Sequence, residues 1–145
     1  GISPSTFTKA GLESVTINGR MYGLPWDTHG GLWHINTKLF EQAGLMRNGK
    51  PVLPTSPEEL LAQARQFRER TGKPYLIQSL VGDPAGAART LYTYLMAQGQ
   101  PIFPEPKRLQ VNTPQGRAIA DLFRQMTAEG LGTSNMDTPA AIAAF

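Results

Sequence analysis

The sequence predicts an α/β fold in which helices pack on a small mixed sheet. Short apolar runs typical of strands lie between longer segments that have helical periodicity and clear start and stop signals. The chain has 145 residues, of which 40% are hydrophobic and 17% charged. A chain of this length can bury roughly two-thirds of its unfolded surface. We therefore expect one domain over residues 1–145, built from layers of helix and sheet.

The first elements are a hairpin and a short helix. Val15–Tyr22 alternates apolar and polar residues around Asn18-Gly19, a pair that accepts the positive φ angles of a type I′ turn. The second arm leads directly into a further strand pattern. Asn36 is placed as the N-cap of a helix that ends at Gly44, where glycine takes the left-handed conformation. Met46–Pro54 contains two prolines and is expected to be a loop.

The strongest helix signal comes next. Ser56 is an N-cap residue, Pro57 suits the first helical position, and Glu59 completes a capping box. The helix is predicted to run to Gly72, with an apolar face formed by Leu60, Leu61, Ala64 and Phe67. The apolar run Tyr75–Gln78 after it predicts a buried strand.

Three more helices and one strand are predicted in the remaining chain. A helix over Pro84–Gln98 has an apolar face of Ala88, Leu91, Tyr92, Leu95 and Met96. Leu109–Val111 follows as a strand. Thr113-Pro114 then begins a helix with an apolar face of Ala118, Ile119, Leu122, Phe123 and Met126. Thr138 is expected to cap a last helix over Pro139–Phe145, whose pattern runs to the final residue and indicates a piece of a longer protein.

Composition excludes several classes of function. The net charge of +3 comes from 14 Lys and Arg residues scattered among 11 Asp and Glu residues, which does not form the basic stripe of a nucleic-acid-binding protein. Cysteine is absent, so disulfides and thiol chemistry are excluded. No apolar run approaches the roughly 18 residues of a membrane span, and Gly1–Ala10 lacks the pattern of a signal peptide.

The segment Tyr22–Asn36 has the composition of a cleft wall. Aromatic rings supply flat apolar area, Asp27 and His29 supply directional hydrogen bonds, and two glycines let the backbone approach a ligand closely. Each tryptophan has two interpretations, a stacking platform or a core side chain. We expect Trp26, at the exit of the strand, to have an exposed face. Trp33, inside the strand, is expected to pack in the core.

A metal site is an alternative use of the same segment. Asp27, His29 and His34 could supply a carboxylate and two imidazoles. Extended chain would separate His29 from His34 by about 17 Å, so only a sharp fold between them brings both to one ion. We therefore expect no metal and no cofactor, and we interpret His34 as a core or sheet-face histidine.

A second candidate site is the passage from strand to helix over Ser79–Arg89. Free N–H groups at a helix N-terminus face the crevice in open α/β sheets, which makes Asp83 and Arg89 candidates for ligand contacts. The alternative is that Asp83 only caps the helix. A phosphate-binding glycine loop is absent, as are the motifs of nucleophilic and zinc-dependent hydrolases. A hydrolase of glycosides or phosphoesters would have to use Asp27, His29 and Asp83.

Tyr22–Asn36 together with Lys38–Leu45 resembles a signature of the carbohydrate-type extracellular solute-binding proteins that feed ABC importers. The resemblance extends from about Val15 to Phe145. It implies the type II periplasmic binding protein fold, of which the chain would be most of the C-terminal lobe. It also implies capture of a sugar or related polar solute in an interlobe cleft, permease subunits as partners, and a periplasmic or extracellular location.

The resemblance also assigns candidate residues. Trp26, Asp27, Thr28 and His29 would enter the cleft, with Asp27 and His29 contacting sugar hydroxyls. Asp83 matches an acidic residue of the maltose-binding branch, but Ala85 stands where that branch has a stacking aromatic residue. A single lobe would leave apolar area uncovered, so self-association of the chain is also expected.

Overall fold

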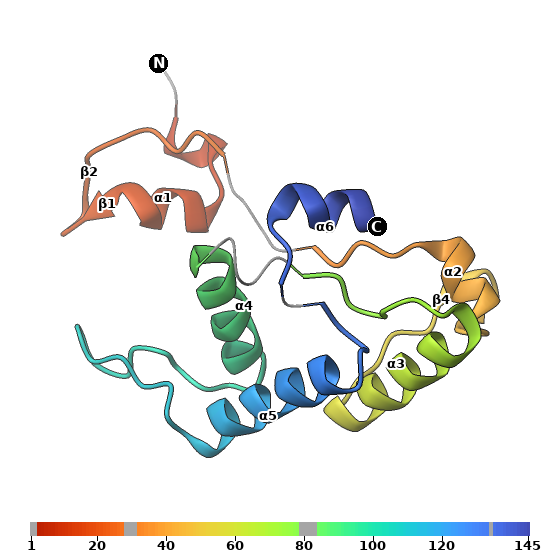
Figure 1. Cartoon of the computed structure of the whole chain (residues 1–145). Helices are drawn as coiled ribbons and strands as arrows, with labels where there is room; N and C mark the ends of the chain where they lie inside the picture. The colour runs from red at the N-terminus through yellow and green to blue at the C-terminus, as the bar shows by residue number, and fades with distance from the viewer. Residues whose placement is uncertain (1–2, 28–31, 79–83, 134) are drawn as a thin grey trace. The chain divides into compact units, whose positions relative to one another are not determined.

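The computed structural model describes residues 3–27, 32–78, 84–133 and 135–145. The chain forms two compact units, unit 1 over Gly1–His34 and unit 2 over Ile35–Phe145 (Figure 1). The predicted α/β class is confirmed, since helices are accompanied by small two-stranded sheets. No helix in the described ranges is both long and apolar enough to cross a bilayer. The assignment of residues 1–145 to one domain stays a prediction.

Unit 1 consists of a short 3-10 helix, one α-helix and one hairpin. These elements are η1 (Pro4–Thr6), α1 (Lys9–Val15), β1 (Thr16–Ile17) and β2 (Arg20–Met21). The two strands pair antiparallel, and Asn18 and Gly19 join them with φ angles of 52° and 76°. The predicted Asn-Gly hairpin is therefore confirmed. Of the described residues in this unit, only Gly11 is buried.

Unit 2 contains the larger part of the chain and the hydrophobic core. Its elements are α2 (Thr37–Gln42), β3 (Met46–Arg47), β4 (Lys50–Pro51), α3 (Pro57–Thr71), α4 (Pro84–Ala97), α5 (Pro114–Ala128) and α6 (Thr138–Ala144). Helices α2 and α3 pack together, as do α4 and α5 (Figure 1). The five α-helices of this unit lie within a residue or two of the ranges that the sequence predicts.

The helix ends follow the predicted capping chemistry. The Ser56 hydroxyl accepts from the backbone N–H of Glu59 at 3.1 Å, and Gly72 ends α3 in the left-handed conformation. The Glu59 carboxylate accepts from the backbone N–H and the hydroxyl of Thr55, both at 2.8 Å. The carboxylate of this capping box therefore binds the residue before the N-cap, and not the N-cap residue itself. These two hydrogen bonds lower the pKa of Glu59. Asn36 and Thr113 cap α2 and α5 in the same manner.

Three aromatic rings form the centre of the core. Phe40 of α2, Phe67 of α3 and Tyr75 lie with ring centroids 5.4–5.8 Å apart, an arrangement that adds to simple area burial. Aliphatic side chains from α3, α5 and the following turn surround them; the buried cluster also includes Ala43, Leu45, Leu60, Ala64, Leu76, Leu122, Met126 and Leu131. The core therefore joins α2, α3 and α5 through the segment that follows α3.

Helix α3 also closes the end of α2. The carbonyl oxygen of Ala43, the C-cap residue of α2, accepts from the Gln66 amide at 2.8 Å and from the Arg70 guanidinium at 3.2 Å. Gly44 follows with φ 71°, and a Cβ there would collide with Arg70. Glycine is favoured at this position by the backbone angle, whereas the arginine end could shift to make room for a Cβ.

The predicted strand over Tyr75–Gln78 is present only as a parallel bridge, between Leu76 and Gly132. The N–H groups of Tyr75 and Leu76 donate to the Leu131 carbonyl at 2.8 and 3.1 Å, and the Thr133 N–H donates to the Leu76 carbonyl at 2.9 Å. The strand prediction was too long because residues 131–133 offer only a short partner. The burial of Tyr75 and Leu76 is confirmed.

Other expectations for strands were wrong. Met46–Pro54 is not a plain loop, because β3 and β4 pair around Asn48 and Gly49, whose φ angles are 50° and 72°. Leu109–Val111 is not a strand. Leu109 is exposed, and Gln110 donates its N–H to the Ile102 carbonyl at 2.8 Å in a loop. An apolar run forms a strand only when another segment lies alongside it.

Details of three helices also differ from the prediction. Met96 and Ala118 lie outside the apolar faces and are exposed, because each projects to solvent from the side of its helix away from the core. The last helix is capped by Asp137, whose carboxylate accepts from the Ala140 N–H at 2.9 Å, and Thr138 is its first residue.

Gly116 gives a test of the α5 packing. In an exposed helix a change from glycine to alanine stabilises by about 1 kcal/mol. At Gly116, however, the added Cβ would lie against the carbonyl oxygen of Val111, a backbone atom. We expect Gly116→Ala to lower the free energy of unfolding by about 1–3 kcal/mol, the usual cost of overpacking. Urea unfolding followed by circular dichroism measures this, with Gln115→Ala as the exposed control. A stabilised Gly116→Ala protein would contradict the packing described here.

An ion pair between α3 and the end of α5 predicts a dependence of stability on pH. Arg65 donates to both Glu129 carboxylate oxygens at 2.7 and 2.8 Å, and Gln125 donates to one of them at 3.0 Å. The hydrogen bonds from Arg65 and Gln125 lower the pKa of Glu129 from 4.5 to about 2. The folded pKa is depressed, so the pair stabilises the protein above the unfolded pKa and is lost as the pH falls toward about 2.

We expect Glu129→Gln to be less stable than the wild type at neutral pH. Its melting temperature should also fall less between pH values of about 5 and about 2, because the folded protein no longer prefers the ionised carboxylate. Thermal melts at a series of pH values test this. The control is Glu69→Gln, an exposed residue on α3. Parallel pH profiles for wild type and Glu129→Gln would rule out a contribution from this pair.

Candidate ligand-binding site

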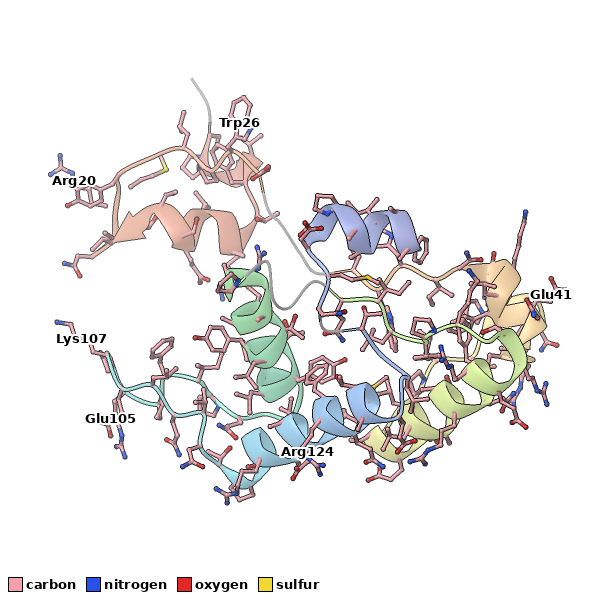
Figure 2. All side chains as sticks on the ribbon, in the orientation of Figure 1. Arg20, Trp26, Glu41, Glu105, Lys107 and Arg124 are labelled. Atoms are coloured by element: carbon pink, nitrogen blue, oxygen red, sulfur yellow. The ribbon has the colours of Figure 1, made fainter. Side chains whose placement is uncertain are left out.

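The structure places Trp26 on the surface of unit 1. Its side chain is 96% exposed, and Tyr22 and Leu24 just before it are 67% and 59% exposed. In Figure 2 the Trp26 side chain projects outward from the ribbon of this unit. The prediction that Trp26 has an exposed face is confirmed.

The backbone before Trp26 is held against α1. Pro25 packs so close to Gly11 that a Cβ on Gly11 would lie 3.3 Å from the Cβ of Pro25. The Tyr22 N–H donates to the Val15 carbonyl at 2.9 Å, which continues the hairpin pairing by one bond. Arg20 lies 5.6 Å above the Tyr22 ring, within cation–π range. Contacts at Tyr22 and at Pro25 therefore hold the backbone that carries the exposed rings of Tyr22 and Trp26.

Asp27 directly follows Trp26 and is exposed. A carboxylate is an acceptor of hydrogen bonds from hydroxyl groups. Thr28 and His29, the other candidates in this segment, lie outside the described residues. Among the residues that the structure covers, this segment therefore contributes one large aromatic face and one adjoining carboxylate.

The expectations for Trp33 and His34 were wrong. Trp33 is 44% exposed, and His34 is exposed as well, so neither is a core residue. The described parts of Tyr22–Asn36 contain no strand. Without a paired neighbour, the apolar and aromatic pattern of this segment has no sheet face to bury.

The second candidate patch is described only in part. Asp83 lies outside the described residues, and α4 begins at Pro84. Arg89 is exposed on α4, and Ala85 in its first turn is exposed too. The structure does not show Asp83 and Arg89 together, so their grouping as contact residues stays a prediction.

No group with the chemistry of a catalytic centre is found in the described ranges. They contain no cluster of three or more His, Cys, Asp or Glu side chains able to hold a metal, although His29 was not covered. Burial raises the pKa of Tyr94 and raises that of Tyr75 to about 12, so both phenols are neutral. Tyr75 donates to Gln63 at 3.1 Å, and the Tyr94 ring packs on Phe123. Both tyrosines are structural.

A shallow hollow on unit 1 is a weaker candidate for a site. Apolar atoms form most of its wall, and its lining residues are Pro4, Ser5, Phe7, Lys9, Leu12, Glu13 and Thr16. Lys9 and Glu13 pair with each other at 3.7 Å across one turn of α1. The hollow is open and carries few convergent polar groups, unlike a specific site for a small polar molecule.

One polar atom that the sequence analysis did not single out stands apart in unit 2. The side-chain oxygen of Gln78 is buried and has no hydrogen-bond partner, the only such side-chain atom among the described residues. Gln78 lies at the end of the predicted strand Tyr75–Gln78, but nothing in the sequence signals that its amide oxygen would be enclosed. The backbone N–H of the same residue donates to the Thr133 hydroxyl at 3.0 Å.

Comparison with known proteins gives one match. A family model described as bacterial extracellular solute-binding protein matches residues 3–145, nearly the whole chain. None of the curated proteins and none of the solved structures matched the chain.

Proposed function

The chain belongs to the bacterial extracellular solute-binding protein family, the substrate-binding components of ABC transporters, and we propose that its solute is a sugar or a related polar molecule. Members of the family act in the extracellular or periplasmic space. We propose the periplasm or the cell surface as the location of this chain, and the permease subunits of an ABC importer as its partners.

The exposed Trp26 side chain carries the proposal of a sugar. An indole that is 96% exposed leaves a large flat apolar surface in water, and covering it with the apolar face of a ligand is favourable. A pyranose ring has one face of C–H groups and a rim of hydroxyls. The indole would pack against the C–H face, and the neighbouring Asp27 carboxylate would accept hydrogen bonds from the rim.

The resemblance to carbohydrate-binding members supports the same contacts. It adds Thr28 and His29 to the segment that enters the cleft, and Asp83 and Arg89 from the second patch. In this proposal two lobes close on the solute, because contacts from both sides stabilise the closed state more than the open one. We also propose that the chain forms most of the C-terminal lobe and that it self-associates.

We propose that the chain is a binding protein and not an enzyme. The family is a solute-binding family that is normally non-enzymatic. The hydrolase alternative would use Asp27, His29 and Asp83, and the family match gives it no support. Glycoside hydrolysis needs two carboxyl groups at a defined separation across the scissile bond, and Asp83 lies outside the described residues.

Fluorescence titration tests the proposed stacking. The chain has two tryptophans, so a Trp33→Phe variant reports from Trp26 alone. We expect glucose, maltose or a related sugar to shift the Trp26 emission to shorter wavelength and to saturate, because a stacked sugar removes water from the indole. A matched titration with sn-glycerol 3-phosphate separates sugars from anionic solutes.

Substitutions then separate binding from folding. Trp26→Ala should weaken sugar binding measured by calorimetry about tenfold or more, and Asp27→Asn should weaken it by about 1–3 kcal/mol. Both should keep the wild-type melting temperature, because the two side chains are exposed. Phe103→Ala removes an aromatic ring that is 57% exposed in unit 2 and should leave binding unchanged. Unaltered affinity in Trp26→Ala would refute the stacking role, and turnover of a chromogenic glycoside would favour the hydrolase.

A further inference from the structure

Two segments of unit 2 end at the same edge. Residues 75–78 run parallel to residues 131–133 through the bridge between Leu76 and Gly132, so their carboxyl ends lie together. At this edge Gln78 and Thr133 are joined, because the Gln78 N–H donates to the Thr133 hydroxyl at 3.0 Å and that hydroxyl lies 3.4 Å from the Gln78 carbonyl. Ligands in open α/β folds bind at the carboxyl ends of parallel strands.

The Gln78 side chain at this edge has an unused acceptor. Its Oε1 atom is buried without a hydrogen-bond partner, although the residue as a whole is only half-buried. A buried carbonyl that makes no hydrogen bond costs free energy of folding, so native proteins rarely keep one without a reason. A ligand hydroxyl that donated to this oxygen would remove that cost, and the gain would appear as binding free energy.

The Gln78 side-chain amide can change its orientation without movement of the backbone. The terminal torsion of glutamine is broad, so the amide turns at little energetic cost. The backbone beneath it stays in place, because the Gln78 N–H is held by Thr133 and the Thr133 N–H is held by the Leu76 carbonyl at 2.9 Å. The side-chain amide of Gln78 can therefore turn while the backbone of the same residue stays in place.

We propose that the Gln78 side-chain carbonyl accepts a hydrogen bond from a hydroxyl of the bound solute. The proposal deepens the proposed function, on which it rests, because a neutral acceptor at this edge favours a polyhydroxylated solute over an anionic one. An ordered water on the same oxygen is the competing explanation, and it predicts a different response to substitution.

Gln78→Met distinguishes the two explanations. Methionine keeps the length of the side chain and removes the amide. If the oxygen binds the solute, the sugar affinity of Gln78→Met should be about 5- to 100-fold lower than that of the wild type. The melting temperature should stay constant or rise, because the variant has no unpaired buried oxygen. If a bound water satisfies the oxygen, the melting temperature should fall and the affinity should hold. Gln110→Met, at an exposed glutamine of the same unit, is the control and should change neither quantity.

Deoxy sugars identify the hydroxyl that would be bound. The probes are 2-deoxyglucose, 3-deoxyglucose and 6-deoxyglucose compared with glucose, in wild type and in Gln78→Met. One deoxy position should lose affinity in the wild type and lose much less in the variant, which is the coupling expected of a direct contact. Equal losses in both proteins would overturn the proposal, and so would a lower melting temperature for Gln78→Met. Binding of no sugar by the wild type would contradict the proposed function itself, whereas sugar binding that Gln78→Met leaves intact would contradict only the role of Gln78.

Discussion

Unit 2 depends on the parallel pairing of residues 75–78 with residues 131–133. Within the described ranges it is the only place where the segment after α3 and the segment after α5 are joined by backbone hydrogen bonds. Tyr75 and Leu76 of the first segment and Leu131 of the second segment are all part of the buried core. The aromatic group of Phe40, Phe67 and Tyr75 then attaches α2. Loss of the pairing would separate the two halves of the core and would also release the edge that carries Gln78.

The three candidate contact residues, Trp26, Asp27 and Gln78, would bind a solute by different physical means. Trp26 offers area, which attracts a ligand without fixing its orientation. Asp27 and Gln78 offer acceptors, which reward a hydroxyl only at the right place and angle. Solute-binding proteins must hold a molecule and then release it, and a few neutral or partly solvated polar contacts suit moderate affinity. Discrimination between solutes would come mainly from the acceptors, since each unmatched polar group penalises the wrong ligand.

Much of the fold was predictable because its signals are local. A cap such as Ser56 or Asn36 and a stop such as Gly72 act within one turn of helix, so sequence alone located the helices. The Asn18-Gly19 hairpin was predicted for the same reason. The same pair at Asn48-Gly49 was interpreted, with the prolines around it, as part of a loop, although it joins β3 to β4. Strands and burial need distant partners. The length of the Tyr75–Gln78 strand, the exposure of Trp33 and the enclosed oxygen of Gln78 all depend on which segments lie alongside, and no local pattern encodes that.

The near absence of buried residues in unit 1 has a thermodynamic consequence. Gly11 alone is buried among the residues described there, so little apolar burial offsets the conformational entropy lost on ordering this part of the chain. Segments of this kind open locally at low free energy and exchange their amide hydrogens quickly. A solute that covered Trp26 would supply the missing burial, and part of its binding energy would be used to order the unit. Amide protection in unit 1 would then report on occupancy, although the same ordering cost would reduce the affinity.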